Sequence, residues 1–171
     1  MHVLFVCAGN ICRSPTAERL TNLYLSRRGV EGVTASSAGV RAVIGHPIHP
    51  HAARVLNEYG AQTSDFAARQ LSAKISSGAD LILTMTAAQT HEVLERAPTK
   101  LHRTFSLGEA SELAKEFQPA SILQLASLRP RLASLNVPDV IDPIGESAEF
   151  FEMVGAQIAD LLPPVIDLCL R

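Results

Sequence analysis

The feature that most constrains the fold is an alternation of short apolar runs with longer stretches of helical periodicity. Strand-type runs occur at residues 2–7, 33–40, 79–85 and, more weakly, 100–107. The run ADLILTM, residues 79–85, is almost continuously hydrophobic, which is typical of a strand covered on both faces. Helical patterns lie between and after these runs, at residues 14–28, 50–59, 86–97 and 147–161, with weaker ones at 107–117 and 121–135. Strands that alternate with helices predict an α/β fold with a parallel sheet and helices on both faces.

Capping residues and prolines predict where several helices start and end. Ser14 followed by Pro15 favours a helix start, and Gly60 is a typical residue just after a helix end. Proline lacks the backbone N–H and clashes with the preceding helical turn. We therefore expect Pro98 to end the helix at 86–97, and Pro163 and Pro164 to break the last helix after residue 161.

Length, composition and net charge favour a single domain that binds neither nucleic acid nor an anionic membrane. The chain has 171 residues, of which 47% are hydrophobic, enough to bury one core, and it has no repeat or linker. We therefore expect a single domain over residues 1–171. A net charge of −2 gives no basic excess, so neither nucleic acid nor an anionic membrane is expected as a partner. The oligomeric state is not predicted.

The apolar segments also bear on location. The N-terminal residues lack the basic region of a signal peptide, and no apolar run is long enough to cross a membrane. We expect a soluble, cytoplasmic protein whose three cysteines, at positions 7, 12 and 169, are thiols.

The loop after the first strand, AGNICRS, carries the strongest chemical signal. Cys7 ends the strand, and ligands of parallel α/β sheets bind at the carboxyl ends of strands. A short loop entering a helix directs backbone N–H groups and the helix dipole at one anion, and Arg13 adds a bidentate grip. The same field stabilises a thiolate, so Cys7 would be ionised beneath the anion. Gly9 and Asn10 suit a loop that turns its amides inward, because both tolerate left-handed backbone conformations, and Ser14 could donate to the Cys7 sulfur.

A different interpretation of the loop is that Cys7 is an inert core thiol and Arg13 a solvated helix residue. A nucleotide-binding loop is disfavoured, because neither GxxxxGK nor GxGxxG occurs in the chain.

Displacement of phosphate from an alcohol or phenol also needs a proton donor. The segment VPDVIDPIG offers Asp139 and Asp142, and Pro143 holds Asp142 in an extended conformation suited to a loop over a neighbouring site. An Asp-Pro pair is equally an ordinary turn signal.

Five segments together resemble the low-molecular-weight protein tyrosine phosphatase family over nearly the whole chain: VCAGNICRSPTAE, SSAGV, ARQL, ADLILTM and VIDPIG. The resemblance implies the phosphotyrosine protein phosphatase I-like fold, a four-stranded parallel sheet with helices on both faces. It implies hydrolysis of phosphotyrosine proteins or small aryl phosphates through a phosphocysteine, with no metal and no cofactor.

The resemblance also assigns roles to residues. It implies that Cys7 is the nucleophile, that Arg13 binds phosphate and that Asp142 is the general acid and then the base. Ser14 would tune the thiolate, and Ser37 would support the loop through hydrogen bonds. The rest of the phosphate-binding loop would be Ala8, Gly9, Asn10, Ile11 and Cys12. Of these, Asn10 would shape the loop, and Cys12 would trap oxidised Cys7 as a disulfide or merely fill space as a small packing residue.

The chain departs from the family pattern at the expected substrate slot. Many members carry aromatic residues where this chain has Ile144 and the pair Val43 and Ile44, so an aliphatic slot forfeits ring stacking worth about 0.5–1.5 kcal/mol. Phe66 stands where a histidine is frequent in the family. Because phenylalanine cannot hydrogen-bond through its side chain, part of the hydrogen-bond network that supports the loop in the family is not expected here. Ile11 stands where members similar to protein-arginine phosphatases have threonine, which disfavours phosphoarginine as a substrate.

Other functions remain as alternatives. An arsenate reductase on the same scaffold would need an external thiol, because no cysteine lies between Arg13 and Leu168. A non-catalytic module that binds phosphoproteins or senses redox state would not need Asp142. The cluster of His46, His49 and His51 lacks a nearby cysteine or carboxylate in sequence, so we predict no metal site there.

Overall fold

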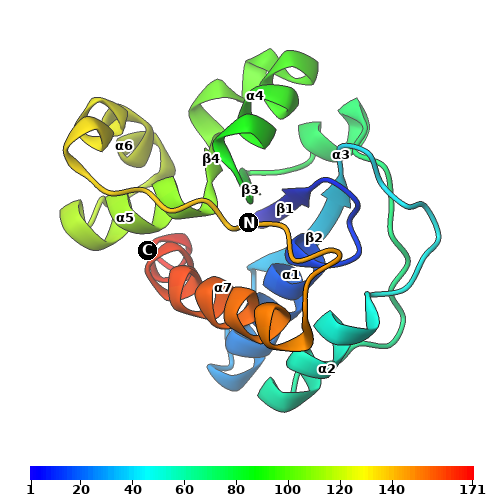
Figure 1. Ribbon diagram of the computed structural model, residues 1–171. Coiled ribbons are helices and arrows are strands. Elements are labelled where there is room, and N and C mark those ends of the chain that lie inside the picture. The colour runs from blue at the N-terminus through cyan, green and yellow to red at the C-terminus, as the bar shows by residue number, and fades with distance from the viewer.

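The computed structural model describes all 171 residues and has a four-stranded parallel sheet at its centre. The strands are β1 (His2–Cys7), β2 (Thr34–Gly39), β3 (Leu81–Thr84) and β4 (Thr104–Ser106), in the spatial order β2-β1-β3-β4 (Figure 1). The predicted α/β class with a parallel sheet is therefore confirmed.

The strand order places the first loop at a reversal of the winding direction. In β1, Val3 pairs with Ala35 on one side and Leu81 on the other, while Cys7 pairs with Gly39. The chain passes from β1 to one side of the sheet to form β2 and returns to the other side to form β3. A crevice opens at the carboxyl edge where such a reversal occurs, and Cys7 ends the strand at that point.

Helices cover both faces of the sheet (Figure 1). One face carries α1 (Arg13–Arg27), α2 (Pro50–Tyr59), α5 (Leu107–Phe117) and α7 (Ala148–Cys169), whereas α3 (Ala73–Ser77) and α4 (Ala87–Arg96) lie on the other. The remaining helical segments are α6 (Ile122–Ser127) and the 3₁₀ helices η1 (Pro98–Arg103) and η2 (Arg129–Ser134).

The core follows from the alternation of side chains along β1. Val3, Phe5 and Cys7 point into the larger hydrophobic cluster with α1, α5 and α7, while Leu4 and Val6 point into the smaller one beneath α3 and α4. All four residues of β3 are buried, as its continuous apolar run predicts.

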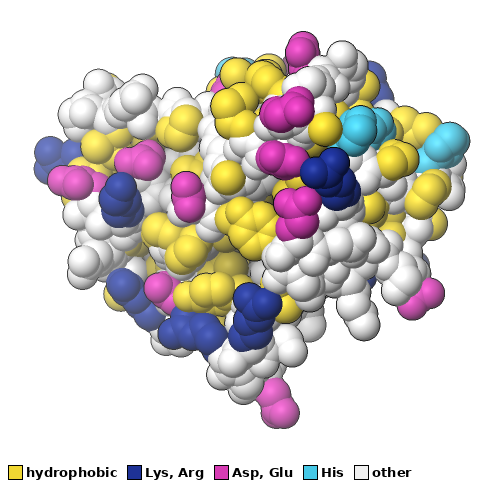
Figure 2. Space-filling view, turned by 60° about the horizontal axis from the view of Figure 1, so that its bottom comes forward, with side chains coloured by type: hydrophobic (Ala, Val, Ile, Leu, Met, Phe, Trp, Pro, Cys, Tyr) yellow, Lys and Arg dark blue, Asp and Glu magenta, His cyan; other side chains and the backbone are white.

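On the face shown in Figure 2, acidic and basic side chains are interspersed with hydrophobic ones. No helix is both long enough and apolar enough to span a membrane.

Several predicted helix ends match the structure. The second helix runs from Pro50 to Tyr59, and Gly60 follows it in the left-handed conformation with φ 81°. The fourth helix ends at Arg96, shortly before Pro98. The capping side chain of α5 is Ser106, which forms a reciprocal capping box with Glu109.

The predicted break in the last helix is wrong. The helix continues through Pro163 and Pro164 to Cys169. The last eight residues of the helix bury Leu162, Val165, Ile166 and Leu168 in the core. At about 1.5–3 kcal/mol for each of these four buried aliphatic side chains, the burial matches or exceeds a cost of about 3 kcal/mol for each of the two prolines inside the helix.

Three further differences concern short elements. The predicted helix at 121–135 is divided into α6 and η2, with Pro130 in the first turn of η2. The strand predicted at 100–107 is confined to Thr104–Ser106 because η1 occupies the residues before it. The five-residue helix α3 has too little length to show a periodic pattern, and the sequence did not predict it.

Candidate active site

The loop from Ala8 to Cys12 joins β1 to α1 and turns its carbonyl groups outward. The carbonyls of Ala8, Gly9 and Ile11 accept hydrogen bonds from the amides of Arg41, Val43 and His49, at 3.0, 2.9 and 2.7 Å. Because N–H and C=O of one peptide unit point in opposite directions, the loop amides are directed to the inner side. The amides of Ala8, Gly9, Ile11 and Cys12 donate to no other group of the protein.

Asn10 provides the backbone turn that this arrangement requires. It has φ 55°, in the left-handed region that asparagine tolerates better than most residues. Gly9, the other residue expected to be left-handed, has no positive φ. Together with the start of α1, the turned loop forms a concave set of N–H donors that suits an oxyanion.

The sulfur of Cys7 lies at the bottom of this loop. It is 3.0 Å from Ser14 Oγ and accepts a hydrogen bond from the amide of Asn10 at 3.3 Å. Cys12 differs in its electrostatics: burial raises the pKa of its thiol well above the usual range, and the negative charges of Cys7 and Asp142 raise it further. Arg13 offsets this rise only in part, so Cys12 is held as a neutral thiol.

Arg13 is almost entirely buried and connects the loop to a distant part of the chain. Its Nη1 donates to the carbonyl of Val140 at 3.0 Å, and its Nη2 donates to Asp142 Oδ2 at 2.5 Å. Its Nε is buried with no hydrogen-bond partner. A buried charged donor without a partner is unfavourable, so the guanidinium is oriented to receive an additional acceptor.

The two candidate acids lie in different surroundings. Asp142 reaches Arg13 and is half exposed, with 46% of its side chain accessible. Asp139 instead accepts from the amide of Ala87 at 3.0 Å and thereby caps the start of α4. The structure thus brings Asp142, and not Asp139, to the loop.

Cys7, Arg13 and Asp142 open onto one hollow of about 260 Å³. Its other lining residues are Ala8, Gly9, Ile11, Cys12, Arg41, Val43 and Ile144. Ile144 therefore lies where the substrate slot was predicted. Ile44 is 69% exposed and does not line the hollow, and Val43 takes that place.

A network of buried polar side chains holds the loop from behind. Asn10 Nδ2 donates to Ser14 Oγ at 3.0 Å and to Ser37 Oγ at 2.8 Å, so Ser37 lies where a loop-supporting residue was expected. Two members of the network were not identified from the sequence: Arg69, whose amide donates to Asn10 Oδ1, and Glu18, which accepts from Ser37 Oγ at 2.6 Å. Arg69 lies in the segment ARQL and Glu18 ends the segment VCAGNICRSPTAE, so their place in these motifs was the available signal.

Two of the three clustered histidines, His49 and His51, lie at the junction of α2 and α7. The rings of His49 and His51 pack on Phe151, with ring centroids 4.7 and 5.1 Å away. No group of three or more His, Cys, Asp or Glu side chains is arranged to hold a metal ion.

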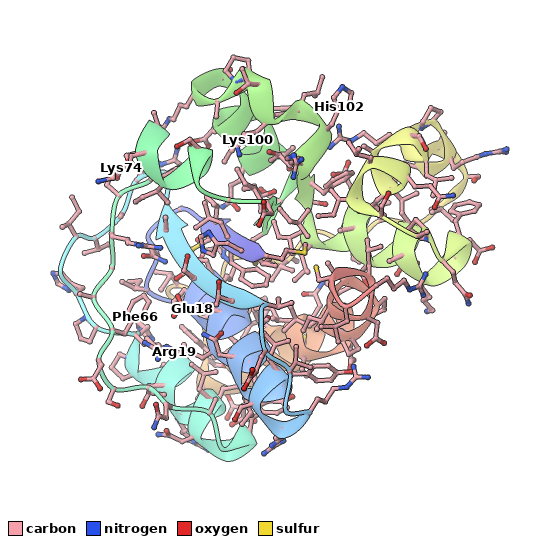
Figure 3. All side chains as sticks on the ribbon, turned by 180° about the vertical axis from the view of Figure 1, so that it is seen from behind. Glu18, Arg19, Phe66, Lys74, Lys100 and His102 are labelled. Atoms are coloured by element: carbon pink, nitrogen blue, oxygen red, sulfur yellow. The ribbon has the colours of Figure 1, made fainter.

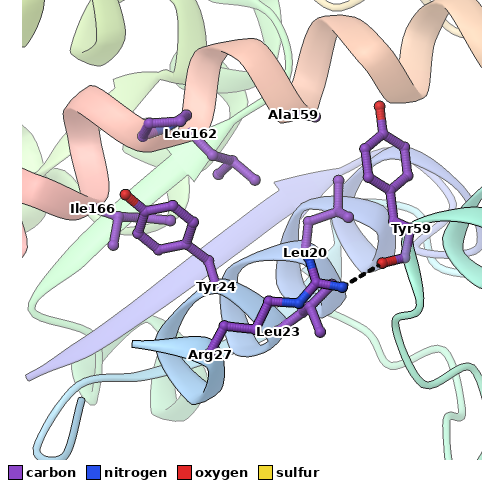
Figure 4. Close-up of a pocket in the computed structure, with 9 residues that line it drawn as sticks. Leu20, Leu23, Tyr24, Arg27, Tyr59, Ala159, Leu162 and Ile166 are labelled. Carbon is purple, nitrogen blue, oxygen red and sulfur yellow. Dashed lines mark hydrogen bonds between the residues drawn. The ribbon is translucent and has the colours of Figure 1, made fainter. Parts of the chain in front are cut away.

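A second hollow, of about 180 Å³, lies between α1, α2 and α7 (Figure 4). Leu20, Leu162 and Ile166 contribute to its apolar wall, and Tyr24 and Tyr59 stand on either side. It shares no residue with the hollow above Cys7.

Comparison with known proteins identifies relatives of this fold and loop. Residues 2–118 match the family model described as low molecular weight phosphotyrosine protein phosphatase. A curated relative from Ralstonia nicotianae, named probable low molecular weight protein-tyrosine-phosphatase EpsP, is 42% identical over 110 residues, which cover 64% of this chain and 72% of the relative.

Solved structures extend the similarity to the whole chain. The low molecular weight protein tyrosine phosphatase from T. tengcongensis has a TM-score of 0.80 and 31% identity over 98% of both chains. The YwlE arginine phosphatase from Geobacillus stearothermophilus has a TM-score of 0.78 and 27% identity, over 99% of this chain and 92% of its own. Asp142 lies outside the segment that matches the family model.

Proposed function

Because the chain belongs to the low molecular weight phosphotyrosine protein phosphatase family, we propose that it hydrolyses phosphotyrosine and other aryl phosphomonoesters through a phosphocysteine, without a metal. The observation that carries this proposal is the convergence of Cys7, Arg13 and Asp142 on one hollow. A thiol, an anion-binding guanidinium and a carboxylate suffice for the two steps of the reaction.

The first step is attack of the Cys7 thiolate on phosphorus. The S–P bond forms as the P–O bond to the leaving group breaks, and Asp142 gives its proton to the leaving oxygen. The free loop amides and Arg13 bind the equatorial oxygens, whose charge they stabilise in the transition state. The buried, unpaired Nε of Arg13 supports this role.

The second step is hydrolysis of the phosphocysteine. Asp142, now ionised, takes a proton from the attacking water, and the S–P bond breaks to regenerate the thiolate. The half-exposed position of Asp142 at the mouth of the hollow supports both roles, since leaving group and water reach it from solvent. Cys12, as a neutral thiol next to the nucleophile in the loop, is proposed to trap oxidised Cys7 as a disulfide.

The walls of the hollow favour an aryl substrate through aliphatic contacts rather than through aromatic ring stacking. Val43 and Ile144 are 39% and 48% exposed and present aliphatic surface to a phenyl ring. Ile11 also lines the hollow, and its apolar side chain offers no hydrogen bond to a guanidinium. We therefore propose phosphotyrosine over phosphoarginine as the substrate, although one structural relative is an arginine phosphatase by name.

The test compares wild type with Cys7→Ser and Asp142→Asn on a phosphotyrosine peptide, p-nitrophenyl phosphate, phosphoarginine and arsenate with added thiol. We expect tyrosine dephosphorylation that vanadate inhibits and that Cys7→Ser abolishes. General acid catalysis is typically worth about 10²–10⁴-fold, so Asp142→Asn should lower kcat on the peptide by a factor in that range.

Asp139→Asn is the matched control, because it changes a neighbouring aspartate that caps α4 rather than facing Arg13. It should retain near wild-type kcat. Equal activity of wild type and Cys7→Ser would refute the phosphocysteine route, and arsenate reduction without phosphoester hydrolysis would favour a reductase instead.

A further inference from the structure

In the polar network behind the loop, the donor and the acceptor of each hydrogen bond can be assigned. Asn10 Oδ1 accepts from the amide of Arg69, which fixes Asn10 Nδ2 as the donor to both Ser14 Oγ and Ser37 Oγ. Since Ser37 Oγ accepts from Asn10, its own proton goes to the carboxylate of Glu18, 2.6 Å away. Since Ser14 Oγ also accepts from Asn10, its proton can be donated to the Cys7 sulfur, 3.0 Å away, with the carbonyl of Ala38 as a more distant acceptor at 3.4 Å.

This chain of hydrogen bonds ends at Glu18. The carboxylate can only accept, so it determines the orientation of the Ser37 hydroxyl and, through Ser37, of the Asn10 amide. Consecutive hydrogen bonds in a buried site also strengthen one another. A carboxylate that moved away would leave Ser37 free to rotate and Asn10 without a fixed acceptor.

Arg19 forms an ion pair with this carboxylate that the sequence pattern did not indicate. Its Nε lies 3.4 Å from Glu18 Oε1 without hydrogen-bond geometry, and the two side chains are only 16% and 12% exposed. The guanidinium carbon lies 5.6 Å from the centre of the Phe66 ring, and Nη2 donates to the carbonyl of Asp65 at 3.3 Å. Figure 3 shows Glu18, Arg19 and Phe66 together on the side of the sheet near α1 and α2.

We propose that Arg19 is a positioning residue for the phosphatase reaction, holding Glu18 at the end of the chain of hydrogen bonds that reaches Cys7. This proposal rests on the proposed function. Phe66 cannot hydrogen-bond to Glu18, and its ring instead supports the guanidinium that pairs with the carboxylate. Arg19 itself does not line the hollow above Cys7.

The consequence is an effect on the thiolate and on kcat rather than on substrate binding. Loss of Arg19 loosens Glu18, and the Ser14 hydroxyl then spends less time directed at the sulfur. One weakened hydrogen bond of about 0.5–1.5 kcal/mol corresponds to a two- to about tenfold loss of rate.

The experiment compares Arg19→Met with Arg27→Met. Arg27 lies on the same helix and bonds to the carbonyl of Tyr59, outside the network, so it matches the loss of one charge. Two quantities are measured: kcat and KM on p-nitrophenyl phosphate, and the rate at which iodoacetamide alkylates Cys7 at pH 6.5, with the site located by tandem mass spectrometry.

We expect Arg19→Met to lower kcat and the alkylation rate by about two- to tenfold each, with KM near the wild-type value. Arg19→Lys should recover part of both, since an ammonium still pairs with Glu18. If Arg19→Met proves too unstable to study, Glu18→Gln removes the same ion pair at unchanged size and should show the same two losses.

Wild-type-like kcat and alkylation in Arg19→Met, or equal losses in Arg27→Met, would overturn the proposal. Alkylation does not require turnover, so it tests the positioning role even if the wild type hydrolyses no phosphoester. That last result would contradict the proposed function instead.

Discussion

At the scale of single residues, the loop gives two cysteines different chemistry. Cys7 and Cys12 lie in the same loop and are both buried. Cys7 receives hydrogen bonds from the Asn10 amide and faces Ser14, whereas burial and the neighbouring negative charges raise the pKa of Cys12. Hydrogen bonds to a sulfur favour its thiolate form, which is the nucleophile and also the form that oxidises more readily. A neutral thiol close by can then react with the resulting sulfenic acid to form a disulfide.

This difference predicts how the protein responds to peroxide. After exposure to hydrogen peroxide, wild-type activity should return on addition of dithiothreitol, because a Cys7–Cys12 disulfide is reducible. In Cys12→Ser, most of the activity should stay lost, since Cys7 proceeds to sulfinic and sulfonic acids. The measurement is p-nitrophenyl phosphate hydrolysis before and after reduction.

Cys169→Ser serves as the control for this experiment. Burial raises the pKa of Cys169 to about 12, and the residue lies at the end of α7 rather than in the loop. It should recover like wild type. Full recovery of Cys12→Ser would contradict the protective role of Cys12.

At the scale of elements, α7 illustrates how packing overrides a local signal. Pro163 and Pro164 remove two backbone donors from the middle of the helix, so the carbonyls of Ala159 and Asp160 lack their usual partners. The helix persists because its buried face continues past the prolines. The two carbonyl groups without partners therefore offset part of the stabilisation that this burial provides.

Replacing Pro164 should recover some of this cost. Pro164→Ala restores an N–H, and we expect the free energy of unfolding to rise by about 1–2 kcal/mol, after allowance for the greater freedom of the unfolded chain. Urea unfolding measures the change. Pro47→Ala, in an exposed loop, should instead lower stability slightly, by about 0.4–1 kcal/mol. An unchanged or lower stability of Pro164→Ala would contradict the assigned cost.

A second element-level contact couples α5 to the segment that carries Asp142. A Cβ atom at Gly108 would collide with the carbonyl oxygen of Pro138. Gly108→Ala should therefore displace the segment from Pro138 to Asp142, lower stability by about 1–3 kcal/mol and lower kcat as the acid moves away from Arg13. Urea unfolding and steady-state kinetics on a phosphotyrosine peptide measure the two effects.

Gly155→Ala is the control for steric cost without a contact to the segment that carries Asp142. Its Cβ would lie 2.5 Å from Val55 Cγ1, at the contact between α2 and α7. It should lower stability, but it should lower kcat in the folded protein less than Gly108→Ala does. Equal kcat in both variants would show that the Pro138 contact does not position Asp142.

At the scale of the whole molecule, the site depends on segments far apart in sequence. The loop follows β1, its outer carbonyls are bound by residues 41–49, and Asp142 arrives from the segment before α7. The same segment of residues 41–49 ends at His49, which caps α2 and stacks on Phe151 of α7. Packing of α2 against α7 and formation of the loop are thereby connected.

This connection predicts a pH dependence of stability. Burial, and next the charge of His51, lower the pKa of His49 below its ordinary value of 6.5. Protonation of His49 therefore favours the unfolded state, so its contribution is complete above pH 6.5 and is lost as the pH falls through the lower folded value. Wild type should lose more stability between pH 8 and pH 5 than His49→Asn, whose side chain keeps a helix cap without titrating.

Urea unfolding at the two pH values provides the comparison, and His91→Asn, on α4, controls for loss of an imidazole elsewhere. If His49→Asn and wild type lost the same stability on acidification, His49 would not be the group responsible.

The sequence by itself determined the features that depend on neighbouring residues. The runs of apolar residues predicted the strands, Gly60 and Pro98 marked helix ends, and the left-handed turn fell on Asn10, one of two residues suited to it. The motif around Cys7 and Arg13 also indicated the chemistry, because a loop entering a helix creates its anion site locally.

Only the tertiary structure decided what depends on contacts between distant segments. It showed that Asp142 rather than Asp139 reaches Arg13 and that Val43 rather than Ile44 lines the hollow. It also showed that α7 continues through two prolines. It also brought Arg19 onto Phe66 beside Glu18. In each case the outcome is set by burial and hydrogen bonding across the fold, which no local pattern of residues encodes.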